Sequence, residues 1–239
     1  LPEVFFAPRM GEPLAGLTES ELARFAAGRE QFVRVFSREE GLGPAFNDRS
    51  CAQCHADPRP GGSGPSFVTR FGRSLPGGGF DAMEELGGSL LQAESIDETW
   101  VEAVPEAADV VADRVTPHMF GAGLVEALSS DAIAVREAAP PDPRVSGRVH
   151  RTPAGAAGRF GWKGSDPDLG FATALAAHHE MGLTSARFPS ESPPGGDAAL
   201  AATHDRVADP ELAPPVIAAM ADYQRFLAPP PQTPPLGMA

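Results

Sequence analysis

The chain has 239 residues, of which 42% are hydrophobic, and this composition excludes an intrinsically disordered protein. Its formal net charge of −13 argues against a nucleic-acid-binding protein, because such binding depends on neutralising phosphates. The charge favours a basic partner or a cationic small molecule, or it serves solubility alone. No apolar run approaches the roughly 20 residues of a membrane span, and the start at Leu1-Pro2 indicates a mature or trimmed form.

The first predicted helix starts at Thr18, where Thr18-Glu19-Ser20-Glu21 has the pattern of a capping box. Apolar residues then recur at helical spacing on one face, namely Leu22, Phe25, Phe32, Val33 and Phe36. We expect Gly41 and Gly43-Pro44 to end this helix, and any helix over the cysteines that follow to be limited to about two turns by Pro58 and Pro60.

Further along, loops and short elements alternate. The 26 glycines and 26 prolines are about twice the ordinary usage and predict short elements joined by long ordered loops. Residues 58–80 read as ordered loop, residues 86–116 as small strands or extended segments, and residues 139–147 as a turn-rich link. Helical patterns occupy about 119–128, 130–138, a segment from Ser165-Asp166-Pro167 to Gly182, and a segment that starts at Asp209-Pro210.

Both cysteines of the chain lie in "RSCAQCHADPRPGG", where Cys51, Cys54 and His55 match C-x-x-C-H, the attachment pattern of c-type haem. Two thiols one helical turn apart can add to the two vinyl groups of a haem, and the next residue is then aimed at the iron. We expect His55 to bind iron through Nε2 and to need a backbone carbonyl for its Nδ1–H.

Three other interpretations of the motif compete with haem attachment. A zinc site usually needs four nitrogen or sulfur ligands, and the chain offers no further cysteine and no histidine close to His55. A thioredoxin-like redox pair would lie in a βαβ setting, which the pattern lacks. A chance match in a buried helix is the third. The sequence therefore predicts one covalent haem c, and with it assembly in an oxidising, extracytoplasmic compartment such as the periplasm.

The ligand opposite His55 decides between electron transfer and catalysis, because methionine or histidine saturates the iron and an open position admits peroxide. Candidates are spread over the chain: Met83, His118, Met119, His150, His178, His179, Met181 and His204. Met181 precedes Gly182 at a predicted helix end, and Met119 lies in the Pro/Gly loop "TPHMFGAG". Each of these residues has an ordinary core or surface interpretation as well.

Four segments resemble the first haem domain of the bacterial di-haem oxidoreductase family, whose members are described as peroxidase-like or as thiol oxidoreductases. The cysteine segment "GREQFVRVFSREEGLGPAFNDRSCAQCHADPRPGG" is the most specific, and the others support it: "RVTPHMFGAGLVEAL", "GRFGWKGSDPDL" and "HEMGLTSARFP". The likeness covers about residues 20–228. The family's later segment carries an acidic-Met-Gly signature, which corresponds here to Glu180, Met181 and Gly182.

The resemblance implies a mainly α, cytochrome c-like haem domain with long Gly/Pro-rich loops and small β insertions. We accordingly expect one domain over residues 1–228, with an irregular insert at about 58–116, and a Pro-rich tail or linker over 229–239. The resemblance also implies a periplasmic location and Met181 as an iron ligand beside His55. The family's second C-x-x-C-H is missing from this sequence, so the chain is expected to be either a fragment or a single-haem relative.

The sequence thus predicts an exported c-type cytochrome that carries electrons to a redox partner. The alternative is a peroxidase-like haem oxidoreductase acting alone or with a second haem domain, for which Glu180, His178 and His179 are candidate acid–base groups. A haem-based sensor or binding module is a third hypothesis. No catalytic residue is assigned from the sequence.

Overall fold

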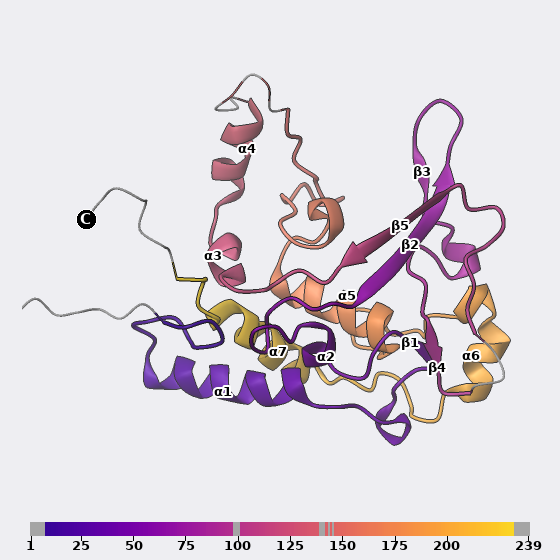
Figure 1. Ribbon diagram of the computed structural model, residues 1–239, viewed down its shortest axis with the longest axis horizontal. Coiled ribbons are helices and arrows are strands. Elements are labelled where there is room, and N and C mark those ends of the chain that lie inside the picture. The colour runs from indigo at the N-terminus through magenta and orange to yellow at the C-terminus, as the bar shows by residue number, and fades with distance from the viewer. Residues whose placement is uncertain (1–7, 98–100, 139–141, 143, 145, 232–239) are drawn as a thin grey trace, which may run out of the picture.

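The computed structural model describes residues 8–97, 101–138, 142, 144 and 146–231 (Figure 1). Within them, helices and short strands both form. The α-helices are α1 (Glu19–Val33), α2 (Cys51–Cys54), α3 (Ala122–Glu126), α4 (Ser130–Ala138), α5 (Leu169–Met181), α6 (Ala198–His204) and α7 (Pro214–Phe226). The strands are β1 (Ala45–Phe46), β2 (Phe67–Ser74), β3 (Phe80–Asp81), β4 (Glu94–Ser95) and β5 (Val110–Val115).

The start of α1 is the one that the sequence predicts. Thr18 is its N-cap, the Thr18 hydroxyl accepts from the Glu21 amide at 3.3 Å, and the Glu21 carboxylate accepts from the Thr18 amide at 2.8 Å. The helix ends at Val33 rather than near Gly41, because Arg34 takes an extended conformation with ψ of 130°. Of the expected apolar face, Phe25 and Phe32 are buried, and Phe36 is buried from the segment beyond the helix.

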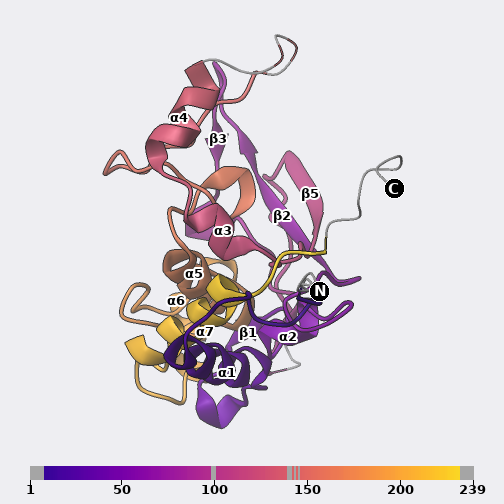
Figure 2. The same ribbon diagram turned by 90° about the vertical axis from the view of Figure 1, so that its left-hand side faces the viewer.

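Helices α1 and α7 cross in close contact and form the base of the molecule (Figure 2). Gly28 makes this approach possible, because a Cβ atom there would lie 2.2 Å from the Ala219 carbonyl oxygen and 2.9 Å from the Tyr223 Cβ. Helix α5 packs on the other side of α7. Two hydrophobic clusters result. The Phe32 cluster contains Phe25, Phe32, Phe120, Tyr223, Phe226 and Leu227. The Met181 cluster contains Phe36, Leu42, Phe46, Ala177, Met181, Leu183, Leu212 and Met220.

Strand β2 is the centre of a three-stranded antiparallel sheet with the order β3-β2-β5, and β1 pairs with β4 in a second small sheet. The prediction of a mainly α fold is therefore wrong, and the described residues form a mixed α/β structure. The assignment of residues 58–80 to loop is also wrong, since β2 lies within them. Glycine and proline flank the segment "FVTRFGRS" on both sides, and for this reason the sequence indicates a loop there. The segment is a strand because β5 pairs with it over six residues.

Two helix starts lie further along the chain than the sequence suggests. Asp166 pairs with Phe160 in a β-bridge, so α5 begins later, with Asp168 as the N-cap that accepts from the Phe171 amide at 2.7 Å. Leu212 likewise pairs with Ser185, and α7 begins only at Pro214. Helix α6 is not among the helices that the sequence pattern predicts.

The boundaries of the predicted domain stay a prediction. Part of the link over 139–147 and residues 232–239 of the expected tail lie outside the described residues. Among the residues that are described, no helix has the length and apolarity needed to cross a membrane.

Candidate haem-attachment site

The cysteine motif forms a single helical turn, α2. Ser50 is its N-cap, with the hydroxyl oxygen 3.3 Å from the Ala52 amide that donates to it, and the same hydroxyl donates to the Phe32 carbonyl. The His55 amide closes the turn by donating to the Cys51 carbonyl at 2.9 Å. Cys51 and Cys54 are both free thiols, and they stand one turn apart as thioether attachment to two vinyl groups requires.

Neither thiol has the environment of a reactive cysteine. Cys51 packs against both hydrophobic clusters, and burial raises the pKa of its thiol to about 12. Burial and then the neighbouring Asp48 carboxylate, whose Oδ2 lies 3.6 Å from the Cys54 Sγ, raise the pKa of Cys54 to about 12. Because the thiolate is the nucleophile, this environment disfavours a redox-active dithiol pair.

The His55 ring is held in one orientation by the backbone. Its Nδ1 atom lies 2.8 Å from the Pro117 carbonyl oxygen and 3.2 Å from that of Gly62. A proton on Nδ1 satisfies both acceptors, and burial lowers the pKa of the ring, so the neutral imidazole keeps a lone pair on Nε2. Within the described part of the chain, Nε2 makes no hydrogen bond. The backbone acceptor that the motif requires is therefore present.

Met181 lies at the end of α5, and its side chain is 3% exposed within the Met181 cluster. Gly182 caps the helix in the left-handed region with φ of 66°, and a Cβ atom there would lie 2.6 Å from the Gly43 carbonyl oxygen. The Gly43 amide donates to the Met181 carbonyl at 3.0 Å. This arrangement fixes the end of α5 against the segment that leads into the cysteine motif.

Cys51 contacts both clusters, and the candidate ligands are divided between them. The His55 ring neighbours Phe32 of the Phe32 cluster, with ring centroids 6.2 Å apart. Met119 also packs against the Phe32 cluster, and its amide donates to the Gly61 carbonyl at 2.7 Å. Met181 belongs to the other cluster. Met119 thus packs against the cluster that contains the aromatic neighbour of His55, whereas Met181 belongs to the other cluster.

The remaining candidates have other surroundings. His178 Nε2 lies 2.8 Å from the Ser190 carbonyl oxygen, and His204 contacts the Leu200 carbonyl and the Asp97 carboxylate. His118 stacks on Phe120, His150 is exposed, and Met83 is fully buried. None of these contacts brings a side chain to the cysteine motif.

Polar groups also gather beside Cys54. Asn47 donates to the Glu180 carboxylate at 2.8 Å, and burial raises the pKa of Glu180. The neighbouring His179 has a pKa lowered to about 4, by burial first and then by His178 and Arg70. The charge of Glu180 is one cause of the raised pKa of Cys54, which shows that the two side chains are near each other. Sequence reasoning considered Glu180 and His179 but missed Asn47 and Arg70, which no motif marks.

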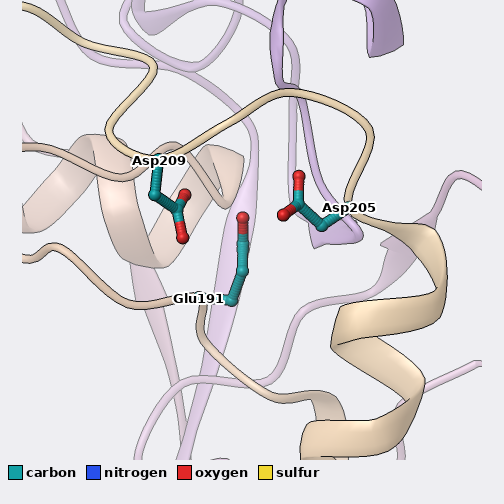
Figure 3. Close-up of side chains that lie close together, drawn as sticks. All are labelled: Glu191, Asp205 and Asp209. Carbon is teal, nitrogen blue, oxygen red and sulfur yellow. The ribbon is translucent and has the colours of Figure 1, made fainter.

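A second group of carboxylates lies apart from the motif. Oxygen atoms of Glu191, Asp205 and Asp209 lie within 4.8 Å of one another (Figure 3). Burial and the neighbouring carboxylates, Glu211 first, raise the pKa of Glu191 to about 9. A proton retained by Glu191 relieves the repulsion within the group. The spacing of these residues follows no motif, and sequence reasoning missed them.

The cysteine motif is not part of the lining of one large surface groove. An apolar groove of about 430 Å³ runs between the N-terminal segment, α3 and α7, and neither the cysteines nor His55 line it. The candidate site therefore rests on the motif and on the anchoring of His55, and not on the shape of the surface.

Comparison with known proteins adds no family assignment: no family model, no curated protein and no solved structure matches this chain.

Proposed function

We propose that this protein binds one haem c through thioether bonds to Cys51 and Cys54, with His55 Nε2 on the iron, and that it carries electrons. The observation that carries the proposal is the single turn α2, which places two thiols and a backbone-anchored imidazole in the order C-x-x-C-H. The bound haem would supply one-electron redox chemistry. The chain would orient the imidazole through the Gly62 and Pro117 carbonyls and shield the attachment edge with the two clusters.

In this proposal Met181 would hold the iron together with His55. Cys51 contacts both clusters and His55 neighbours Phe32, so the second side chain on the iron would come from the Met181 cluster. A thioether is soft and favours ferrous iron, which raises the potential relative to a second imidazole. Met119 is disfavoured because it packs against the cluster that contains the aromatic neighbour of His55.

The location and partner follow from the same chemistry. Haem c attachment requires an oxidising site of assembly, and we place the protein in the periplasm or an equivalent extracytoplasmic compartment. The net charge of −13 suits a redox partner with a basic surface, since complementary charge speeds association. The resemblance to the first haem domain of di-haem oxidoreductases agrees with this role and stays part of the proposal.

A peroxidase-like oxidoreductase is the second candidate. The buried Glu180 and His179 beside Cys54 favour it, because peroxide activation needs an acid–base group next to the iron. Absorption and electron paramagnetic resonance spectra of the oxidised, haem-loaded protein separate the two. A six-coordinate, low-spin iron supports the carrier, and a five-coordinate, high-spin iron that reacts with peroxide overturns it in favour of the enzyme.

A further inference from the structure

Two arginines lie side by side on one face of the β2–β5 pair. Arg114 is the antiparallel partner of Val68, and Arg70 is the partner of Ala112. Because residues two apart in a strand point to the same face, Arg70 and Arg114 are diagonal neighbours on that face. The charge of Arg114 is among the causes that lower the pKa of Arg70, in agreement with this placement.

Neither guanidinium has a carboxylate partner. Within the described residues, no carboxylate oxygen lies within 4.0 Å of either one. Among the described residues, the Arg70 guanidinium donates one hydrogen bond, to the Ser89 hydroxyl at 3.5 Å, and burial lowers the pKa of Arg70. Arg114 lies over the Trp162 ring at 4.7 Å, and its Nε is buried without a hydrogen-bond partner.

Two other arginines do have a carboxylate partner. Arg73, on the opposite face of β2, pairs with Asp81 at 2.6 Å, and Arg225 pairs with Glu126 at 2.6 Å. The Glu180 and Asp166 carboxylates raise the pKa of Arg70 from beyond 4.0 Å, but a half-buried guanidinium without a direct ion pair is costly, because its desolvation is not offset by pairing. Two of them together indicate that an anion belongs on this face.

The face lies within reach of the haem motif. Gly64 touches the Cys54 carbonyl, with only 2.1 Å between that oxygen and a Cβ built on the glycine, and Ser66 is among the groups that lower the pKa of Cys54. Strand β2 starts at Phe67 and runs away from this point (Figure 1). Arg70 follows Ser66 by four residues, or roughly 13 Å at about 3.3 Å per residue. That distance is comparable with the width of a porphyrin ring.

A haem carries its two propionates on the edge opposite the vinyl groups that react with cysteine. A ring attached at Cys54 and lying along β2 would therefore present its carboxylates to this face. Glu180 is near both Cys54 and Arg70, which agrees with a short distance between the cysteine motif and the two arginines. Arginine is well suited to the role, because its planar guanidinium binds a carboxylate through two parallel hydrogen bonds.

We propose that Arg70 and Arg114 form a carboxylate-binding face whose ligands are the two propionates of the covalently attached haem. This assignment rests on the proposed function. Each arginine would be a positioning residue that fixes the free edge of the ring and places positive charge beside it. Since ferrous haem carries one positive charge less than ferric haem, this charge would raise the midpoint potential.

The test uses the haem-loaded protein and three variants: Arg70→Gln, Arg114→Gln and the matched control Arg73→Gln, which lies on the other face of β2. Intact mass first establishes one haem in each sample. Potentiometric titration is then expected to give a lower midpoint potential for Arg70→Gln and Arg114→Gln and an unchanged one for Arg73→Gln. Arg70→Lys, which keeps the charge, should restore part of the shift, whereas a merely structural role of Arg70 would give no such rescue.

A titration of the wild type with acetate distinguishes the propionates from a free carboxylic acid. The proposal expects no effect, because the propionates already occupy the arginines. An acetate-dependent change of potential that disappears in Arg70→Gln would overturn the assignment in favour of a site for a soluble carboxylate. Haem-loaded Arg70→Gln and Arg114→Gln with the potential of the control would also overturn it. A wild type without haem would contradict the proposed function as well, and the mass alone would show that.

Discussion

The His55 imidazole shows how much of the geometry of a candidate site residue is decided by its neighbours in space. The motif fixes only its sequence position, directly after Cys54. The Gly62 and Pro117 carbonyls fix its tautomer and orientation, and Pro117 is 62 residues away along the chain. The proposed site therefore depends on the loop before α3 as much as on the cysteine turn.

Met181 is the residue on which the distinction between carrier and enzyme depends. In haem-loaded protein, we expect Met181→Leu to lose the sulfur–iron charge-transfer absorption, to have a lower potential and to bind carbon monoxide. Met119→Leu is the matched control, because Met119 packs against the cluster that contains the aromatic neighbour of His55, and its spectrum should stay that of the wild type.

If Met181 only fills the core, Met181→Leu roughly conserves volume and costs less than about 1.5 kcal/mol of unfolding free energy, with the spectrum unchanged. That result would remove Met181 as a ligand. The same spectral changes in Met119→Leu would move the ligand to Met119.

Glu191 should make the stability of the protein depend on pH. Burial and its carboxylate neighbours raise its pKa from 4.5 to about 9, so between these values the folded state holds a proton that the unfolded chain has released. The unfolding free energy should therefore fall as pH rises through this window. Glu191→Gln should flatten this part of the dependence and stabilise the protein above pH 8.

Chemical denaturation at a series of pH values, with a chelator present, measures this dependence. Glu30→Gln serves as the control, because Glu30 is exposed on α1. Parallel curves for the wild type and Glu191→Gln would show that Glu191 holds no such proton.

At the scale of elements, the contact between α1 and α7 holds the base of the fold. An added methyl at Gly28 would collide with the Ala219 carbonyl, at 2.2 Å, on a helix backbone that cannot yield easily. Gly28→Ala should therefore destabilise the protein by about 1–3 kcal/mol or more through overpacking, although alanine is the better helix former by about 1 kcal/mol.

The control for this contact is Ala27→Gly at the exposed neighbouring position of α1, which should cost only about 1 kcal/mol through helix propensity. Urea unfolding of both variants measures the difference. A Gly28→Ala protein more stable than the wild type would mean that α1 and α7 do not approach as closely as described.

Local signals in the sequence predict the elements that depend on them. The capping box of α1, the bounds of α4 and the Gly182 stop of α5 all follow from residues within a few positions of one another. Strand β2 does not, because its partner β5 lies about 40 residues away and its glycine- and proline-rich flanks indicate loop. The late starts of α5 and α7 have the same cause, since bridges to other segments keep Asp166 and Leu212 extended.

The same limit applies to the candidate site. The spacing of Cys51, Cys54 and His55 is local, and the sequence is enough to predict their role. Arg70 and Arg114 come together only through strand pairing. The carboxylates of Figure 3 come together only through the packing of loops around α6. The spacing of these residues in the sequence predicts neither the arginine pair nor the group of carboxylates.

At the scale of the whole molecule, the structure differs from the expected mainly α architecture. It has two hydrophobic clusters lined by helices and a β-sheet beside them. Cys51 is the point where the two clusters meet. This position explains why a haem attached there would be enclosed on both sides of its attachment edge. The β2–β5 pair would then cover the ring further out, where Arg70 and Arg114 lie.

Covalent haem is the central claim, and the intact mass of the protein tests it most directly. Protein produced in cells with a c-type haem maturation system should carry the mass of one haem after denaturation, and the doubly substituted Cys51→Ala, Cys54→Ala protein should carry none. A wild type that has only the mass of its polypeptide under these conditions, or that holds zinc in native mass spectra, would contradict the account.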